Sequence, residues 1–408
     1  MNRVVITGAG IISPLGNNVH TFWNHLKQGK SGISILDVDE DYGKTAAGVV
    51  HDFDPVEIFG KKQARKMDRF TQFALAATEQ ALESSELDLD KTNKERLGVF
   101  VGSGIGGINT LIENVNILNK KGSSRVSPSL VPTMIPNAAA AQISIRLGAL
   151  GPSISPVTAC SIGNTSIGEA FNTIKHGDAD IIFAGGTEAA INSLSLSSFR
   201  NAQALTKNLD PTSASRPFDE ERDGFVISEG AGILVLESLE SAVKRAAPVL
   251  CEVIGYRSSS DAYHMVSPNP EGIGAYLSMK KALESGNVTP DKIDLISAHA
   301  TSTKIGDISE TLAIKKAFGE KAYGVPITAN KSMLGHMLGA SGSVEAIALI
   351  ESIKHGIIPP TINLNNPDPD CDLDYVSEGM RRQQINIGLS NSFGFGGHNA
   401  TILLKKYL

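Results

Sequence analysis

Short apolar segments alternate with longer amphipathic segments along the whole chain. The early apolar segments are "RVVITG" at 3–8, "RLGVFVG" at 96–102, "SISPVTA" at 153–159 and "ADIIFAGG" at 179–186. Several are β-branched and apolar on both faces, which is typical of strands buried in the middle of a sheet. The segment 69–85 instead repeats its apolar residues at helical spacing. This alternation predicts an α/β fold in which helices cover sheets.

Two helix-like segments end in the same four residues, Ile-Lys-His-Gly. "SIGEAFNTIKHG" ends at Gly177, and "VEAIALIESIKHG" ends at Gly356. One explanation is shared helix-ending chemistry, because Lys and His favour the negative end of a helix and glycine takes the left-handed turn. The other explanation is a fused duplication, with related halves at 1–250 and 251–408. No linker of prolines or charges separates these halves, so we expect them to act as one body.

The composition argues against several kinds of function. The net charge is −6, so the surface as a whole does not attract nucleic acid or an anionic membrane. No apolar stretch is long enough to span a bilayer, and "MNRVVITGAG" leads directly into a strand-like segment rather than a secretory signal. The three cysteines are far apart and form no CxxC motif, which predicts neither disulfides nor a cysteine-rich metal site. We therefore expect a cytoplasmic protein without a metal.

Cys160 is the first candidate for chemistry. It lies between the apolar segment 153–159 and an amphipathic helical segment, which places it at the start of a helix. The unpaired N–H groups there favour a thiolate over a thiol and can hold an oxyanion. The alternative is an inert buried cysteine, the common state of free cysteines. Cys251 lies in a strand-like segment and Cys371 in a polar loop, so we expect both to be structural.

Two of the nine histidines lie next to turns. His299 ends the segment "IDLISAHA", and His336 lies between glycines in "NKSMLGHMLGASG". Open α/β sheets place ligand contacts at such strand ends and turns. A neutral imidazole there can act as a base or donate its N–H to a carbonyl that becomes an enolate. Lys331 and Glu310 are near enough in sequence to orient these histidines, although each of the four residues can also be an ordinary polar residue.

Glycines are dense in three further stretches. "NSFGFGGHNATILL" interleaves Phe393 and Phe395 with glycines, which predicts either a mobile loop beside a ligand or a tight bend between strands. "TGAGIISPLG" lacks the third glycine of the dinucleotide motif, and "GSGIGG" lacks the Lys-Ser/Thr of a phosphate-binding loop. The last two stretches are therefore only weak signals for a dinucleotide.

The order of these motifs resembles the β-ketoacyl-acyl carrier protein synthases. "TACS" with Cys160, "AHATST" with His299, "NKSMLGH" with Lys331 and His336, and "NSFGFGGHN" follow one another as in that family, most closely as in its bacterial type II elongating enzyme. Further matching stretches, from "VVITGAGIISPLGN" to "PPTINLNNPDPDCDLDYV", extend the resemblance over essentially the whole chain. It implies the thiolase fold, a duplicated five-layer α/β/α/β/α body that dimerises.

The resemblance also implies a decarboxylative Claisen condensation. Cys160 would hold an acyl group from acyl carrier protein, and malonyl-acyl carrier protein would lose carbon dioxide and attack that thioester. His299 and His336 would bind the malonyl carbonyl, and Lys331, paired with Glu310, would organise the site. No metal or redox cofactor is implied, because loss of carbon dioxide itself generates the carbanion. The product would be a 3-oxoacyl-acyl carrier protein in fatty acid elongation; a polyketide or specialised-lipid pathway uses the same site and stays open.

The other functional positions of the family also match. The backbone N–H groups of Cys160 and Phe395 would form an oxyanion hole, and Phe395 would gate the cavity opposite Asp261. The implied substrate-binding residues are Ile105, Phe393, Thr301 and Thr303. Five cations fall at or near the positions that dock the acidic carrier protein, with scattered solvated charges as the alternative: Lys62, Arg65, Lys66, Arg125 and Lys207.

The chain departs from the family pattern at two motifs. "HATST" has Ala300 where the family has glycine, which costs about 1 kcal/mol if this position has a positive φ. "ANKSMLGH" lacks the family's hydroxyls at Ala329 and Leu334. We expect these changes to affect rate and chain-length preference rather than the reaction itself. A thiolase acting on coenzyme A would need a late cysteine, where this chain has His398, and a non-catalytic chain-length factor would lack Cys160.

Overall fold

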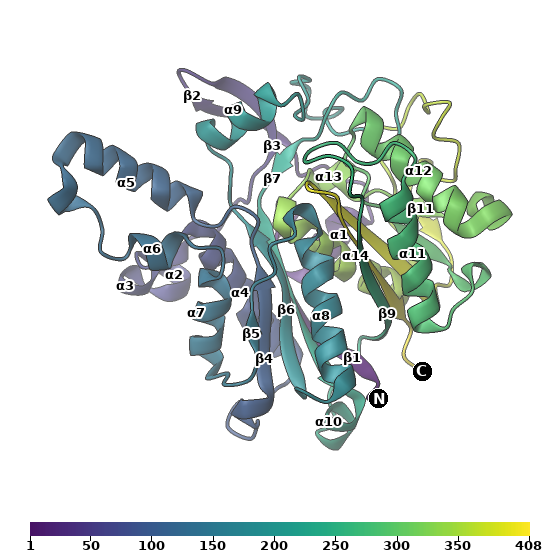
Figure 1. The fold of residues 1–408 in the computed structure, drawn as a ribbon, viewed down its shortest axis with the longest axis horizontal. Helices are drawn as coiled ribbons and strands as arrows, with labels where there is room; N and C mark the ends of the chain where they lie inside the picture. The colour runs from purple at the N-terminus through teal and green to yellow at the C-terminus, as the bar shows by residue number, and fades with distance from the viewer.

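A computed structural model describes residues 1–408, and its centre is one ten-stranded sheet (Figure 1). The strand order is β11-β10-β14-β15-β9-β1-β8-β6-β4-β5. From the β1–β9 junction, one half runs through β1 (Val4–Ile12), β8 (Gly230–Ser238), β6 (Ile181–Glu188), β4 (Leu97–Gly102) and β5 (Ser153–Ile154). The other half runs through β9 (Cys251–Ser260), β15 (His398–Lys405), β14 (Ile387–Gly394), β10 (Leu295–Ser297) and β11 (Ile327–Thr328). In both halves the first three strands are antiparallel and the last three parallel, so one pattern occurs twice.

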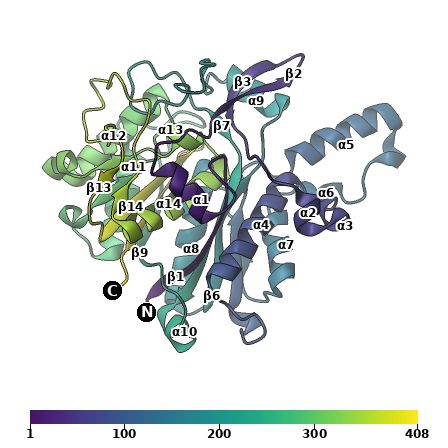
Figure 2. The ribbon, with the colours of Figure 1, turned by 180° about the vertical axis from the view of Figure 1, so that it is seen from behind.

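Two helices lie between the halves of the sheet, and four cover its outer faces (Figures 1 and 2). The inner helices are α8 (Ile162–His176) and α14 (Ser341–His355); the outer ones are α4 (Arg69–Ser84), α7 (Ala138–Leu147), α11 (Ile273–Gly286) and α12 (Lys304–Phe318). The outer helices α4 and α7 cover the N-terminal strands, and α11 and α12 cover the C-terminal strands. The predicted five layers, α/β/α/β/α, are confirmed.

The two inner helices repeat each other in length and ending. Each has 15 residues and ends at a glycine in the left-handed conformation, Gly177 or Gly356. They cross near their N-termini, where a Cβ on Gly163 would lie 2.2 Å from the backbone nitrogen of Ser343. Because the strand order repeats together with these helices, duplication accounts for the shared sequence ending better than helix-ending chemistry alone.

Three apolar clusters fill the spaces between the layers. The largest has 40 buried residues around α8 and α14, and it draws on strands of both halves. The clusters under the outer helices are smaller, with 25 and 21 buried residues. The two halves therefore share their main core, which is how a single body is held together.

The remaining elements are two small sheets and eight further helices. Strands β2 (Ser34–Asp39), β3 (Gly43–Gly48) and β7 (Ile227–Ser228) form a small sheet, and β12 (Ile357–Ile358) pairs with β13 (Arg381–Arg382). The other helices are α1 (Val19–Leu26), α2 (Pro55–Phe59), α3 (Lys61–Ala64), α5 (Ile108–Lys121), α6 (Leu130–Met134), α9 (Ser193–Asn201), α10 (Leu239–Lys244) and α13 (Lys331–Leu334). The helix α5 projects from the body as an arm (Figure 1). None of the helices has the length and apolar character needed to cross a membrane.

One predicted strand is much shorter than expected. Of the segment 153–159, only Ser153 and Ile154 pair with a neighbouring strand. Pro152 and Pro156 flank this pair, and proline cannot donate an N–H to a strand ladder. The chain therefore reaches Cys160 through an irregular connection.

Candidate active site

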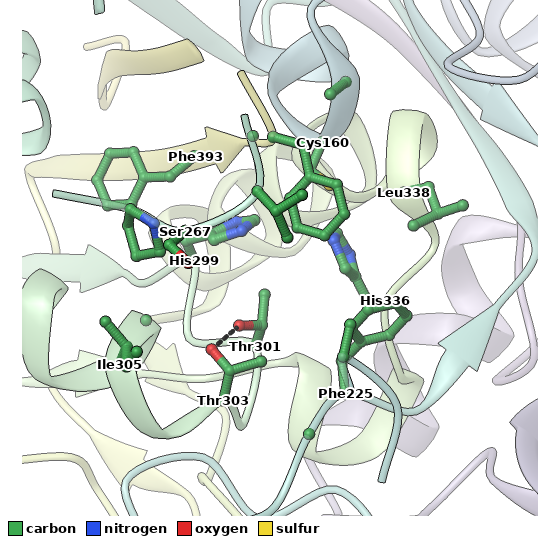
Figure 3. A pocket seen from close by; sticks show the side chains of 18 of the residues that line it. Cys160, Phe225, Ser267, His299, Thr301, Thr303, Ile305, His336, Leu338 and Phe393 are labelled. Atoms are coloured by element: carbon green, nitrogen blue, oxygen red, sulfur yellow. Dashed lines mark hydrogen bonds between the residues drawn. The ribbon is translucent and has the colours of Figure 1, made fainter. Parts of the chain in front are cut away.

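Cys160, His299 and His336 line one cavity of about 560 Å³ (Figure 3). Cys160 lies in the short 3-10 turn η3 (Ala159–Ser161) that leads into α8, His299 follows β10, and His336 lies between α13 and α14. The rings of His299 and His336 are 5.4 Å apart and meet edge to face. All three side chains are buried, so the fold brings the predicted trio together at the floor of a cavity.

The backbone at Cys160 is tightly packed and strained. Ala159 has a φ of +50°, a value that a residue with a side chain rarely adopts. Gly394 lies so close that a Cβ there would be 2.9 Å from the backbone nitrogen of Cys160. Burial raises the pKa of the Cys160 thiol to about 12, although the charge of Lys331 and the N–H of Phe395 act to lower it. Desolvation of this thiol therefore opposes the thiolate more strongly than these two groups favour it.

The buried ammonium of Lys331 pairs with Glu345. Its Nζ lies 2.5 Å from Oε1 of Glu345, 2.6 Å from the carbonyl oxygen of His299 and 3.4 Å from Nδ1 of His299. The predicted pairing of Lys331 with Glu310 is wrong. Its carboxylate instead accepts the backbone N–H groups of His299 and Ala300 at 2.9 and 2.7 Å. Glu310 thus holds the backbone N–H of His299, and Lys331 contacts both its carbonyl oxygen and its ring.

Glu345 is a site residue that the sequence analysis missed. It lies on α14, one of few charged residues in the otherwise apolar run "VEAIALIESI", and that isolation is the signal that singles it out. Burial raises its pKa to about 7, and the positive charge of Lys331 opposes this shift. This carboxyl therefore binds a proton more readily than an exposed glutamate does.

Both histidines are neutral and can donate from Nε2. Burial lowers the pKa of each well below its ordinary value, and the positive charge of Lys331 adds to the effect. Because an ammonium has no lone pair, Nδ1 of His299 must be the acceptor toward Lys331, which leaves its proton on Nε2. Nδ1 of His336 lies 2.9 Å from Oγ of Ser341, whose hydroxyl can donate to it in the same way. Two N–H donors then face one cavity.

Phe395 lies at the tip of the β14–β15 hairpin, which is tied to the facing loop. The N–H of Asp261 donates to the carbonyl of Gly397 at 2.9 Å, and the N–H of Gly396 donates to Met265 at 2.7 Å. Gly396 and Gly397 have φ values of +80° and +73°, which glycine adopts without strain. Asp261 therefore does lie opposite the hairpin, as expected, and the two loops close over the cavity together.

The four predicted substrate-binding residues, Ile105, Phe393, Thr301 and Thr303, line the same cavity. The hydroxyls of Thr301 and Thr303 are 3.0 Å apart (Figure 3). Phe225, which the sequence analysis missed, contributes a ring 5.3 Å from that of His336. The cavity thus has a polar side at the threonines and aromatic walls beside the histidines.

The five predicted docking cations are exposed but do not form one cluster on the chain. Lys62, Arg65 and Lys66 lie together at α3, and Arg125 follows the α5 arm. Lys207 lies in the loop after α9, and both views separate α9 from α3 (Figures 1 and 2).

No group of three or more His, Cys, Asp or Glu side chains that could hold a metal ion occurs in the chain.

A duplicated five-layer fold with a cysteine and two neutral histidines in one cavity defines a class, the thiolase-fold acyltransferases. Within this class, the sequence model "Beta-ketoacyl synthase, N-terminal domain" matches residues 1–242, and "Beta-ketoacyl synthase, C-terminal domain" matches residues 250–365. The chain belongs to the beta-ketoacyl synthase family.

Several relatives match the chain over nearly its full length. A 3-oxoacyl-[acyl-carrier-protein] synthase 2 of Synechocystis sp. is 47% identical over 99% of this chain and 98% of its own. The protein of the same name from Staphylococcus aureus is 46% identical, with the same coverage. Two solved structures cover all of both chains: a type II PKS ketosynthase in complex with its acyl-carrier protein (TM-score 0.92, 34% identity) and a beta-ketoacyl synthase from Burkholderia phymatum (TM-score 0.93, 32% identity).

Proposed function

We propose that this chain elongates acyl groups in fatty acid synthesis by condensing them with malonyl-acyl carrier protein. The products are 3-oxoacyl-acyl carrier protein and carbon dioxide. The observation that carries this proposal is the meeting of Cys160 with the neutral imidazoles of His299 and His336 in one cavity. The identity of 46–47% to 3-oxoacyl-[acyl-carrier-protein] synthases 2 supports fatty acid elongation over polyketide synthesis, since the polyketide ketosynthase is more distant at 34%.

Cys160 first takes the acyl group from its carrier. Its sulfur attacks the thioester carbon, the carrier sulfur leaves, and the thiol proton passes to that departing sulfur. The backbone N–H groups of Cys160 and Phe395, which already act on the sulfur, stabilise the negative charge that develops on the thioester oxygen. The acyl-enzyme is neutral, so it suits the desolvated position of this sulfur better than a thiolate does.

Decarboxylation then generates the nucleophile for the second step. The malonyl thioester oxygen accepts hydrogen bonds from Nε2–H of His299 and His336. The bond to the carboxylate breaks, carbon dioxide leaves, and its electron pair spreads over the α-carbon and the oxygen between these donors. The α-carbon attacks the acyl carbonyl, and the Cys160 sulfur leaves and takes up a proton from water. Lys331 keeps the His299 ring in the donor tautomer throughout.

The carrier protein docks on the exposed cations. Lys62, Arg65 and Lys66 form one contact group, and Arg125 and Lys207 add contacts from separate elements. Opposite charge speeds such an encounter, which suits an acidic carrier. A similar ketosynthase has been solved in complex with its acyl-carrier protein, which supports a protein-bound substrate.

The active form in this proposal is a cytoplasmic homodimer. The strand β5 lies at the edge of the ten-stranded sheet, and exposed apolar side chains cluster around it, including Ile145, Ile154 and Val157. An open edge strand with apolar neighbours is a template for pairing with a second copy.

Each chain divides near residue 250 into a half with the nucleophile and a half with the histidines. All three cysteines are free, which fits a reducing compartment.

Acylation of Cys160 tests the proposal. Purified protein is incubated with acyl-acyl carrier protein, and its peptides are weighed by mass spectrometry. We expect the acyl mass on the Cys160 peptide of the wild type and of Cys251→Ala, which alters another buried cysteine outside the cavity. Cys160→Ala is expected to carry no acyl group. A wild type that stays unmodified contradicts the proposed function.

A further inference from the structure

A buried carboxylate beside Cys160 has no part in the reaction described above. Glu188 ends β6, is fully buried, and lines the same cavity as Cys160. It forms no ion pair; burial raises the pKa of this carboxyl, and only hydrogen bonds from uncharged groups oppose that shift. Burying a carboxylate without a cation is costly, and this cost needs a compensating role.

The carboxylate of Glu188 joins two segments that are far apart in sequence. Its Oε1 accepts the hydroxyl of Ser103 at 2.7 Å and the N–H of Ile105 at 3.1 Å. Its Oε2 accepts the N–H of Gly104 at 2.8 Å and the N–H of Gly339 at 3.2 Å. Four donors thus converge on one side chain, three of them from a single turn of the first half.

Each of the two segments has a glycine where the carboxylate approaches the backbone. A Cβ on Gly104 would lie 2.9 Å from Oε2 of Glu188, and one on Gly339 would lie 3.0 Å from the same atom. A side chain at either glycine would therefore displace the carboxylate from its present position. The hydroxyl of Ser103 also accepts the N–H of Gly106 at 3.0 Å, so the whole turn is ordered through Glu188.

The same two segments supply the apolar wall next to Cys160. Ile105 comes from the turn that Glu188 binds, and Leu338 directly precedes Gly339. Both side chains belong to one apolar cluster with Cys160, and Figure 3 shows Leu338 beside Cys160 and His336. Leu338 has a φ of +47°, a strained value that an anchored neighbour helps to maintain. An alkyl chain on the Cys160 sulfur finds its apolar surroundings in this cluster.

We propose that Glu188 is a positioning residue for acyl selectivity: it fixes Ile105 and Leu338 relative to Cys160 and so determines which acyl chains the sulfur accepts. This inference rests on the proposed function, in which Cys160 carries the acyl group. Glu188 touches neither the acyl chain nor the reacting atoms; it acts through the two backbone segments that it binds.

Competition between a short and a long acyl-acyl carrier protein tests this role. Both are offered together, and mass spectrometry gives the ratio of the two adducts on Cys160. In Glu188→Gln the amide nitrogen can only donate, so one pair of donors loses its acceptor: either the Ser103 hydroxyl and the Ile105 N–H, or the N–H groups of Gly104 and Gly339. We expect the adduct ratio to change by about tenfold, toward weaker discrimination, which corresponds to about 1.4 kcal/mol. The matched control is Glu237→Gln, a fully buried glutamate on β8 outside the cavity, which should keep the wild-type ratio.

A milder variant covers the case in which Glu188→Gln does not fold. Ser103→Ala removes one donor and keeps the carboxylate, so it should shift the ratio in the same direction by a smaller factor. A wild-type ratio in the folded Glu188→Gln variant, or in Ser103→Ala where Glu188→Gln is unfolded, overturns the positioning role. If the wild type itself forms no adduct, the proposed function fails, and this inference fails with it.

Discussion

At the scale of single residues, strained backbone lies beside each of the three reactive side chains. Ala159 precedes Cys160 with a φ of +50°, and Ala300 follows His299 with a φ of +37°. Leu338, two residues after His336, has +47°. Such conformations persist only where the surrounding packing imposes them, and they aim the neighbouring side chains. The positive φ at Ala300 is the condition under which the sequence analysis expected alanine to cost stability.

The Glu345 carboxylate should make stability depend on pH. Its pKa is raised to about 7 in the folded chain, above its value in the unfolded chain. Between these two pKa values the folded chain binds a proton that the unfolded chain has released. The contribution of Glu345 to the free energy of unfolding is therefore complete below about pH 4 and is lost as the pH rises through 7. We expect the free energy of unfolding of the wild type to fall relative to that of Glu345→Gln by about 1 kcal/mol per pH unit between pH 5 and 7. Urea unfolding at several pH values measures this difference, and parallel curves would show that Glu345 does not titrate there.

His336→Ala should separate acylation from decarboxylation. The variant keeps Cys160 and the backbone donors, so acyl transfer to the sulfur continues. It removes one of the two N–H donors to the enolate, and loss of such a donor lowers the rate by about 100- to 1000-fold. Mass spectrometry follows the adduct, and carbon dioxide release follows decarboxylation. The control is His176→Ala, an exposed histidine at the end of α8. Normal decarboxylation by His336→Ala would refute the donor role.

At the scale of elements, the sequence predicts where strands and helices occur better than it predicts which side chains meet. The central strands and α4 appear within a few residues of the expected positions because their apolar patterns are long and regular. The partner of Lys331 was assigned wrongly because the choice between Glu310 and Glu345 depends on which helix brings its carboxylate to α13. That arrangement is set by packing between segments, which a local pattern does not encode. Glu188 was missed for the same reason, since its four donors come from distant segments.

The β14–β15 hairpin gives a prediction at this scale. A Cβ on Gly397 would lie 2.8 Å from Cβ of Asp261, and the position has a positive φ. Gly397→Ala should therefore separate the two loops over the cavity and lower the condensation rate by about tenfold or more. Gly43→Ala is the matched control, since Gly43 also has a positive φ but has no neighbour within 4 Å. Equal condensation rates in the two variants would mean that the contact between the loops has no role in turnover.

At the scale of the whole molecule, the exposed edge of the sheet predicts a dimer. Ile154 lies on β5 and is 49% exposed in the single chain, so Ile154→Asp should be nearly neutral for a monomer. In a dimer joined at β5, it would bury an unpaired charge in the interface and force dissociation. Light scattering should find a dimer for the wild type and for Val243→Asp, a control on α10, and a monomer for Ile154→Asp. A dimeric Ile154→Asp variant would place the interface elsewhere.

The central claim is that one cavity first stores an acyl group on Cys160 and then uses it to capture a decarboxylated malonyl group. A single-turnover experiment tests this most directly: pre-acylated protein is mixed with malonyl-acyl carrier protein, and the Cys160 adduct, carbon dioxide and carrier-bound product are followed together. The account predicts that the adduct disappears as one carbon dioxide and one 3-oxoacyl-acyl carrier protein appear for each adduct lost. Carbon dioxide release with the adduct intact, or loss of the adduct as free acid, would contradict it.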